Sequence, residues 1–293
     1  MTNDVTGKTI LITGTSTGIG RATALHLDQL GYQVIGTVRK ESDAQDIQES
    51  ASSKLRVLLL DVASPSDLFQ FQESLEQELG NGGLWALINN AAIGFSSPLE
   101  FVALDQFRQL FEVNLFGLLA VTQICLPYIR QEQGRVINIS STASIVIAPF
   151  HGPYSAAKIG LNALSNALRL ELRPFGIQVS VMVCGSVQTP IWDKGGALAR
   201  HLWEEQPPEA TQLYGAQYAQ LGSFFEQMGH KGLPPKKVAE TIDHALSSKQ
   251  PKQTYYIGRD AQQFRLLNKL VPERLRDWLI LRIIGLDTQS PRP

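Results

Sequence analysis

The sequence has little cysteine. Cys125 and Cys184 are the only two in 293 residues, and apolar residues surround both of them. Two such thiols suit a reduced, buried state better than a disulfide framework. The composition therefore argues against a small disulfide-stapled protein and predicts two free, buried thiols.

Neither sign of charge dominates the chain. The 26 basic residues are balanced by 27 acidic ones, which gives a net charge of −1. A balanced chain has no global field that would draw it to nucleic acid or to anionic lipid. We therefore expect no nucleic-acid partner, and we predict no metal site.

Long apolar runs and linkers are missing as well. No apolar run reaches the roughly 18 residues that a membrane span needs. Residues 1–7 are polar and lead directly into a predicted strand, which argues against a signal or transit segment. No stretch rich in Pro, Gly or Ser divides the chain. We expect a cytoplasmic protein, and its 43% hydrophobic content is ample for a core.

Short β-branched runs alternate with longer amphipathic stretches. Strands are predicted at 8–13, 33–38, 56–61, 84–89, 134–140, 178–183 and 254–257. Helices are predicted at 18–30, 66–79, 104–130 and 154–173. The strands are almost continuously apolar, as expected where both faces of a sheet are covered. The alternation predicts a single-domain α/β fold with a doubly wound parallel sheet of about seven strands and helices on both faces.

A glycine-rich turn follows the first predicted strand. It reads Gly14, Thr15, Ser16, Thr17, Gly18, Ile19 and Gly20. Glycines let the backbone turn tightly and approach a pyrophosphate, which the free N–H groups at a helix N-terminus then hold. Because this turn links a strand to a helix at the start of an alternating α/β chain, it predicts a dinucleotide site.

Two later strand ends supply candidate contacts to the same ligand. Asp61, with Val62 beside it, is placed to hold the adenine amino group. Asn89 and Ala91 are placed to line the nucleotide ribose. The alternative for each is that the polar side chain only satisfies a strand end.

The end of the second strand distinguishes between cofactors. An acid at this position usually holds a free 2′-hydroxyl, whereas a 2′-phosphate needs a cation. The strand ends in Val38, Arg39 and Lys40, without a carboxylate. The sequence therefore favours NADP(H), with Arg39 as a contact, over NAD(H), which stays possible. In the alternative interpretation, Arg39 and Lys40 are solvated surface charges.

Tyr154 and Lys158 are four residues apart at the start of a predicted helix, which places both side chains on one face. An ammonium about 4 Å from a phenol, at an effective dielectric near 20, would favour the phenolate by about 4 kcal/mol. The tyrosine pKa would then fall by roughly three units, to where general acid/base catalysis works best. Ser141 follows the preceding strand, at the sheet edge where ligands bind. Taken alone, the pair could also be an ordinary helix start with a solvated lysine.

Together these motifs resemble the classical short-chain dehydrogenases/reductases over about residues 8–257. The matching positions are Gly14, Gly18, Gly20, Asp61, Asn89, Asn90, Ala91, Asn114, Ser141, Tyr154, Lys158, Gly185, Val187 and Thr189. The resemblance implies a Rossmann fold and an oxidoreductase that uses a nicotinamide cofactor.

The resemblance also implies roles for individual residues. Ser141 would hydrogen-bond the reacting oxygen, and Tyr154 would supply or remove its proton. Lys158 would hold the nicotinamide ribose and lower the tyrosine pKa. Asn114 would position a water in the proton relay.

After the sixth strand, the backbone near Val187 and the hydroxyl of Thr189 would hold the nicotinamide carboxamide. Residues 83–85, 111–117 and 170–176 look like the branch that contains retinol and hydroxysteroid dehydrogenases. That similarity implies a bulky apolar alcohol or ketone, retinoid-, steroid- or lipid-like. Long helices commonly form subunit faces in this family, so we expect a homodimer or homotetramer.

The last third of the chain is expected to control specificity. Residues 191–233 are predicted as the substrate lid of a domain spanning 1–260, and their aromatic side chains could line a large apolar pocket or only pack the lid onto the body. Residues 261–293 are predicted as an amphipathic helical extension, with one helix over 264–286. Its alternating basic and apolar residues could dock on the body or a partner subunit, or contact a membrane peripherally.

The sequence thus predicts hydride transfer between NADP(H) and an apolar alcohol or ketone, with Tyr154 as general acid/base. The first alternative is an NAD(H)-dependent dehydrogenase of the same family. The second is a nucleotide-binding redox sensor without turnover. Retention of Ser141, Tyr154 and Lys158 together argues against the sensor, because a sensor has no need for all three.

Overall fold

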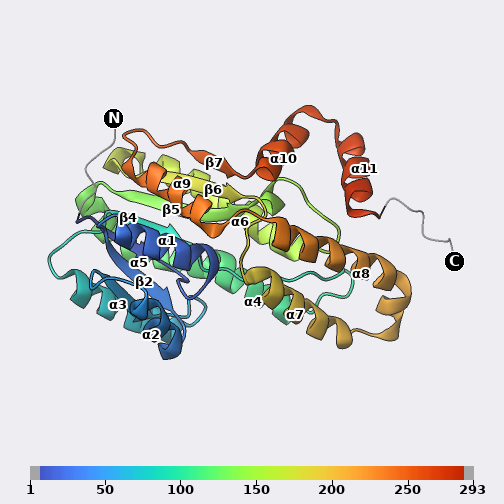
Figure 1. Ribbon diagram of the computed structural model, residues 1–293, viewed down its shortest axis with the longest axis horizontal. Coiled ribbons are helices and arrows are strands. Elements are labelled where there is room, and N and C mark those ends of the chain that lie inside the picture. Colours follow the sequence, from blue (N-terminus) through green and yellow to red (C-terminus); the bar gives the residue numbers. More distant parts are fainter. Residues whose placement is uncertain (1–6, 287–293) are drawn as a thin grey trace.

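A computed structural model describes residues 7–286 of the protein (Figure 1). The prediction that the chain starts without a leader rests mainly on residues 1–6, which lie outside this range. The last seven residues of the predicted extension also lie outside it.

Seven parallel strands form the central sheet, in the order β3-β2-β1-β4-β5-β6-β7. The strands are β1 (Thr9–Ile12), β2 (Gln33–Val38), β3 (Leu55–Leu59), β4 (Ala86–Asn89), β5 (Arg135–Ser141), β6 (Gln178–Cys184) and β7 (Thr254–Ile257). The strand order reverses between β1 and β4, where doubly wound sheets open a crevice at their carboxyl ends. The predicted fold class is confirmed.

Helices cover both faces of the sheet. One face packs on α1 (Gly18–Gln29) and α9 (Pro235–Ser247); the other packs on α3 (Pro65–Leu79), α5 (Leu118–Glu132) and α6 (Gly152–Glu171). Alternate residues of a strand point to opposite faces. Accordingly, Ile10 and Ile12 belong to the first core and Leu11 to the second, and all three are fully buried.

The helical stretch from Leu104 to Glu132 comprises α4 (Leu104–Phe111), a π-helical segment (Glu112–Gly117) and α5. Contrary to the expectation from the sequence, its length and composition would allow it to cross a membrane. In this fold it serves as a core helix, because Val121, Cys125 and Ile129 are fully buried in the second core. Cys125 and Cys184 are both buried and free, as predicted.

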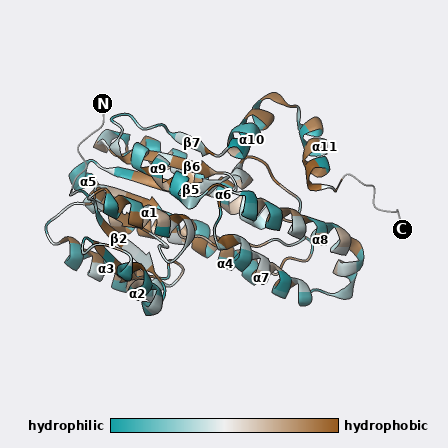
Figure 2. Ribbon diagram, viewed as in Figure 1, coloured by the Kyte–Doolittle hydropathy of each residue, from teal (hydrophilic) through white to brown (hydrophobic). Residues whose placement is uncertain are grey.

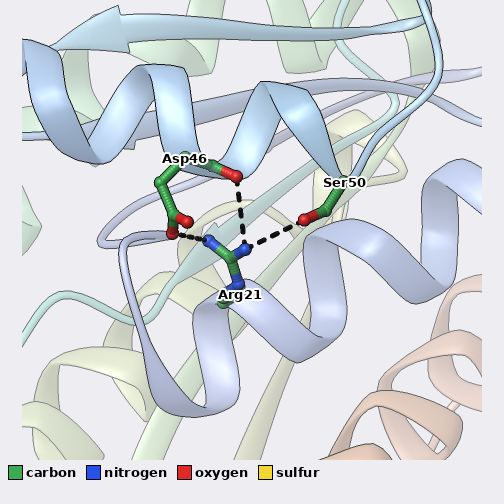
Figure 3. A network of polar contacts seen from close by, with 3 residues as sticks. All are labelled: Arg21, Asp46 and Ser50. Atoms are coloured by element: carbon green, nitrogen blue, oxygen red, sulfur yellow. Dashed lines mark hydrogen bonds and ion pairs between the residues drawn. The ribbon is translucent and has the colours of Figure 1, made fainter.

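Helices α2 (Glu41–Glu49) and α9 are among the helices that were not predicted. Helix α2 buries only Ala44 and Ile47, too few apolar positions for a periodic signal. Polar contacts attach it to α1: Arg21 donates from Nη1 to Asp46 Oδ2 at 2.6 Å and from Nη2 to Ser50 Oγ at 3.2 Å (Figure 3).

The lid and the C-terminal segment are helical. Residues 191–233 contain α7 (Ile191–Glu204) and α8 (Pro208–Lys231). The single helix predicted over 264–286 is instead two, α10 (Arg259–Leu270) and α11 (Glu273–Ile284). The break falls at Val271, which is extended because proline disfavours helical backbone in the residue before it, here at Pro272. Both helices carry hydrophilic and hydrophobic residues (Figure 2).

Candidate functional site

A cavity of about 1230 Å³ lies at the carboxyl edge of the sheet. The turn after β1, the ends of β4, β5 and β6, and the lid helices all contribute to its walls. Such a volume can hold both a dinucleotide and a second ligand, because drug-sized ligands occupy about 300–1,000 Å³.

The glycine-rich turn lines one end of the cavity. Gly14 and Gly18 have φ angles of +71° and +61°, which side-chain-bearing residues rarely adopt. A Cβ on Gly20 would overlap Gly14 O and Asn90 Nδ2, so glycine is required for α1 to start this close to the turn. The first turn of α1, residues 18–21, carries no acid. This N-terminus fits the pyrophosphate of a dinucleotide.

The turn residues divide into two groups. Ser16, Thr17 and Ile19 line the cavity together with Gly14 and Gly18. The Thr15 side chain does not line the cavity, and its role as a cofactor contact stays a prediction. It is fully buried, and its hydroxyl donates to Thr37 O at 3.1 Å, so it fixes the turn to β2.

Asn89, a predicted contact to the nucleotide ribose, is the last residue of β4. Its side chain is buried beneath the cavity and donates to Thr122 Oγ1 at 3.0 Å and to Asn138 Oδ1 at 2.8 Å. The neighbouring Asn90 was not predicted as a site residue, although it lines the cavity. Its amide donates to Thr13 O and Gly14 O, both at 2.9 Å, and so holds the glycine turn in shape. Ala91 lines the cavity as expected from its position.

Arg39, Asp61 and Val62 lie together on the cavity wall beyond the turn. Arg39 Nη1 is 4.0 Å from Asp61 Oδ2, and the Arg39 side chain is 65% exposed. A guanidinium that is this open and follows β2 directly can reach a phosphate on the adenosine ribose. Among these three residues the negative charge of Asp61 is already offset by Arg39.

Ser141, Tyr154 and Lys158 meet at the centre of the cavity wall. Ser141 ends β5, and Tyr154 and Lys158 come from the first two turns of α6. Ser141 and Tyr154 are hydrogen-bonded through their side chains. Lys158 is 3% exposed and donates from Nζ to Ile139 O at 2.9 Å. The structure therefore brings together three of the four predicted catalytic side chains.

The expected direction of the Tyr154 pKa is wrong. Burial raises it to about 12, although the hydrogen bond with Ser141 acts the other way. Lys158 Nζ lies 5.7 Å from the centre of the tyrosine ring and donates to a carbonyl, and burial lowers its own pKa to about 8. The lowered tyrosine pKa expected from the helix spacing assumed a closer cation. It also left out desolvation, which raises the pKa of a buried phenol.

Asn114 lies in the π-helical segment and its side chain does not line the cavity. Its amide oxygen accepts from Ile93 N at 2.9 Å, and its amide nitrogen donates to Ile93 O at 2.8 Å. Asn114 thus fixes the loop after β4, which does line the cavity.

Val187 and Thr189 line the cavity opposite the glycine turn. A Cβ on Gly18 would lie 3.1 Å from Thr189 Cβ and Cγ2, so the two loops are in contact. The residues at these positions fit a dinucleotide that stretches from Arg39, across the turn, to the tyrosine.

A comparison with protein families identifies this arrangement. The short chain dehydrogenase family model matches residues 8–197. The chain belongs to this family. It is therefore an oxidoreductase, and its membership supports a nicotinamide dinucleotide as cofactor.

Curated relatives cover nearly the whole chain. Dehydrogenase/reductase SDR family member 9 of Homo sapiens is 34% identical, over 95% of this chain and 89% of the relative. Retinol dehydrogenase 5 of Mus musculus is 33% identical, over 96% of this chain and 90% of the relative. The 17-beta-hydroxysteroid dehydrogenase type 6 of Bos taurus is 32% identical, over 94% of this chain and 88% of the relative. These relatives confirm the branch that the motifs implied.

A solved structure agrees with this fold. A short-chain dehydrogenase from Streptomyces avermitilis superposes with a TM-score of 0.75. It is 28% identical, and the match covers 94% of this chain and 98% of that one.

In the present protein, the outer part of the cavity is apolar. The lid contributes Trp192, Trp203, Tyr218, Phe224, Phe225 and Met228. The C-terminal helices contribute Phe264, Ile280, Ile283 and Ile284. Ile280 and Ile284 also pack on Leu221 of α8, so α11 docks on the lid and lines the cavity at the same time.

His151 adds a polar ring to this wall. It lines the cavity, and its ring centre lies 4.9 Å from those of Tyr154 and of Phe225. Burial lowers its pKa to about 4, so the imidazole is neutral at physiological pH. Its Nδ1 is 3.1 Å from Ser96 Oγ.

Proposed function

We propose that this protein is an NADP(H)-dependent oxidoreductase that interconverts a bulky apolar alcohol and the corresponding ketone. The observation that carries the proposal is the meeting of Ser141, Tyr154 and Lys158 between the glycine turn and an apolar chamber. One end of the cavity suits a charged dinucleotide, the other suits an apolar substrate, and the titratable trio lies between them.

The chain's own residues handle the oxygen of the substrate. When bound, the nicotinamide cofactor supplies or accepts the hydride. In the reductive direction Tyr154, protonated at neutral pH because its pKa is about 12, donates its phenolic proton to the carbonyl oxygen as that oxygen gains negative charge. Ser141 hydrogen-bonds the same oxygen, and the Lys158 ammonium favours the phenolate that remains.

The lining of the outer cavity supports a large apolar substrate. Tryptophan, phenylalanine and isoleucine side chains from α7, α8, α10 and α11 provide most of this wall. The names of two relatives, a retinol dehydrogenase and a hydroxysteroid dehydrogenase, point to the same class of compound. We therefore propose a retinoid-, steroid- or lipid-like alcohol or ketone.

Replacement of the tyrosine tests the proposed reaction. Tyr154→Phe keeps the ring and removes the proton donor, so turnover should fall by about 100-fold or more, the lower range for general acid catalysis. The assay follows the nicotinamide absorbance band with retinoids, steroids and aliphatic ketones. The matched control is Tyr128→Phe, at a tyrosine of α5 that does not line the cavity. A redox sensor would give binding without turnover for every compound, and no loss on Tyr154→Phe.

The preference for NADP(H) rests on Arg39. This guanidinium lines the cavity next to Asp61, and the position after β2 holds no acid. Within the dinucleotide end, Arg39 is the cation best placed to meet a 2′-phosphate.

Replacement of this arginine tests the cofactor choice. Arg39→Asp should raise the KM for NADPH by about tenfold or more, because the variant repels the phosphate, and should improve use of NADH. Arg108→Asp, on the exposed face of α4, is the control. Better activity of the unmodified protein with NADH would contradict the choice.

We further propose that this otherwise cytoplasmic protein contacts membranes peripherally through α10 and α11. Leu266, Leu270, Leu275 and Trp278 are exposed on these helices. The cations Arg265, Lys269, Arg274 and Arg282 are exposed around them. An apolar strip with tryptophan and flanking cations suits the interface of an anionic bilayer. The same helices line the cavity, so an apolar substrate could enter from the lipid.

Introducing a negative charge at these exposed apolar positions tests this contact. Leu270→Glu and Trp278→Glu should each reduce co-sedimentation with vesicles containing anionic lipid by several-fold, because a buried carboxylate opposes insertion. Phe69→Glu, at an exposed phenylalanine of α3, should bind like the unmodified protein. Equal co-sedimentation of all four proteins would contradict the contact.

A further inference from the structure

The loop that follows β6, residues 185–189, is held by contacts from several elements. Gly185 N donates to Ile257 O at the end of β7, at 2.8 Å. Leu233 N donates to Ser186 O at 2.8 Å, and Gln188 N donates to Leu233 O at 2.9 Å. Within this loop, one backbone amide is bound by a side chain from the C-terminal helices.

That side chain is Asp260, the second residue of α10. Its Oδ2 accepts from Ser186 N at 2.6 Å, and its Oδ1 accepts from Ala261 N at 2.9 Å. Among residues 7–286 the Asp260 carboxylate forms no ion pair, so its charge is stabilised by hydrogen bonds from these two backbone amides. Hydrogen bonds from amides to a carboxylate are short and roughly twice as strong as neutral ones.

The backbone around this carboxylate is shaped to admit it. A Cβ on Gly185 or on Gly258 would overlap Asp260 Oδ1. Gly258 also has a φ of +109°, which directs the chain from β7 into α10. Two glycines on different segments therefore leave room for one carboxylate against the loop.

Asp260 does not line the cavity, whereas Ser186, Val187 and Thr189 do. The Asp260 carboxylate fixes the amide of Ser186, and the next residues face the region between the glycine turn and Tyr154. This bond to the Ser186 amide adds to the backbone bonds that orient Val187 and Thr189 toward the cavity.

We propose that Asp260 is a positioning residue that holds the loop 185–189 in the orientation that binds the nicotinamide half of the cofactor. It acts through the backbone of Ser186 and does not itself touch cofactor or substrate. The C-terminal helices are thereby part of the dinucleotide site. The inference rests on the proposed function, because it requires a nicotinamide dinucleotide in the cavity.

Binding of whole and truncated cofactors tests the proposal without turnover. Dissociation constants are measured by calorimetry for NADPH and for 2′-phospho-ADP-ribose, which lacks the nicotinamide. Asp260→Ala should weaken NADPH binding by about tenfold or more, because the less constrained loop must then be ordered when the cofactor binds. Binding of the fragment should change less than twofold. Asp260→Asn keeps an acceptor of the same shape. Its dissociation constant for NADPH should lie between those of Asp260→Ala and the unmodified protein.

The control variant is Asp277→Ala, an exposed acid on α11 that should change neither constant. Equal weakening of NADPH and of the fragment, or unchanged NADPH binding in Asp260→Ala, would overturn the proposal. Thermal unfolding of each variant shows whether it is folded, and Asp260→Asn carries the test if Asp260→Ala is not. NADH and ADP-ribose are titrated in parallel. If the protein bound NADH and ADP-ribose but not the two phosphorylated ligands, the NADP(H) preference would be overturned. The comparison of NADH with ADP-ribose would then test Asp260 in the same way.

Discussion

The desolvation of Tyr154 and Lys158 against the end of β5 is the constraint on which the site depends. Burial raises the pKa of the phenol and lowers that of the ammonium, so it opposes charge on both. Lys158 stays in place because Ile139 O accepts its hydrogen bond, and Tyr154 because Ser141 shares one with it. This pair lies in the cavity because the parallel strands place all their carboxyl ends at one edge.

Local patterns were enough to predict all seven strands, the glycine turn and the shared face of Tyr154 and Lys158. Local patterns do not contain the contacts between distant segments. Asn89 pairs in register with Asn138 on β5, and its amide turns toward that neighbour instead of the cavity. The direction in which the Tyr154 pKa shifts depends on burial by the lid and sheet. The spacing of two residues in the sequence does not reveal this burial. The break at Pro272, by contrast, could have been read from the proline itself.

The C-terminal helices connect both halves of the site. Asp260 at the start of α10 binds the loop after β6, and Ile280 and Ile284 of α11 line the apolar chamber. One short segment therefore contacts the proposed cofactor loop at one end and the substrate wall at the other. Its exposed face carries leucines and a tryptophan among cations. The predicted homodimer or homotetramer stays a prediction.

Titration of the Tyr154 phenol in the free protein tests the central claim most directly. The difference in phenolate absorbance between the unmodified protein and Tyr154→Phe is followed as the pH is raised. Because burial places the pKa at about 12, the account predicts no phenolate from this residue at neutral pH. It also predicts that alcohol oxidation, which needs the phenolate, accelerates with pH. A full phenolate step near neutral pH, absent from Tyr154→Phe, would contradict the account.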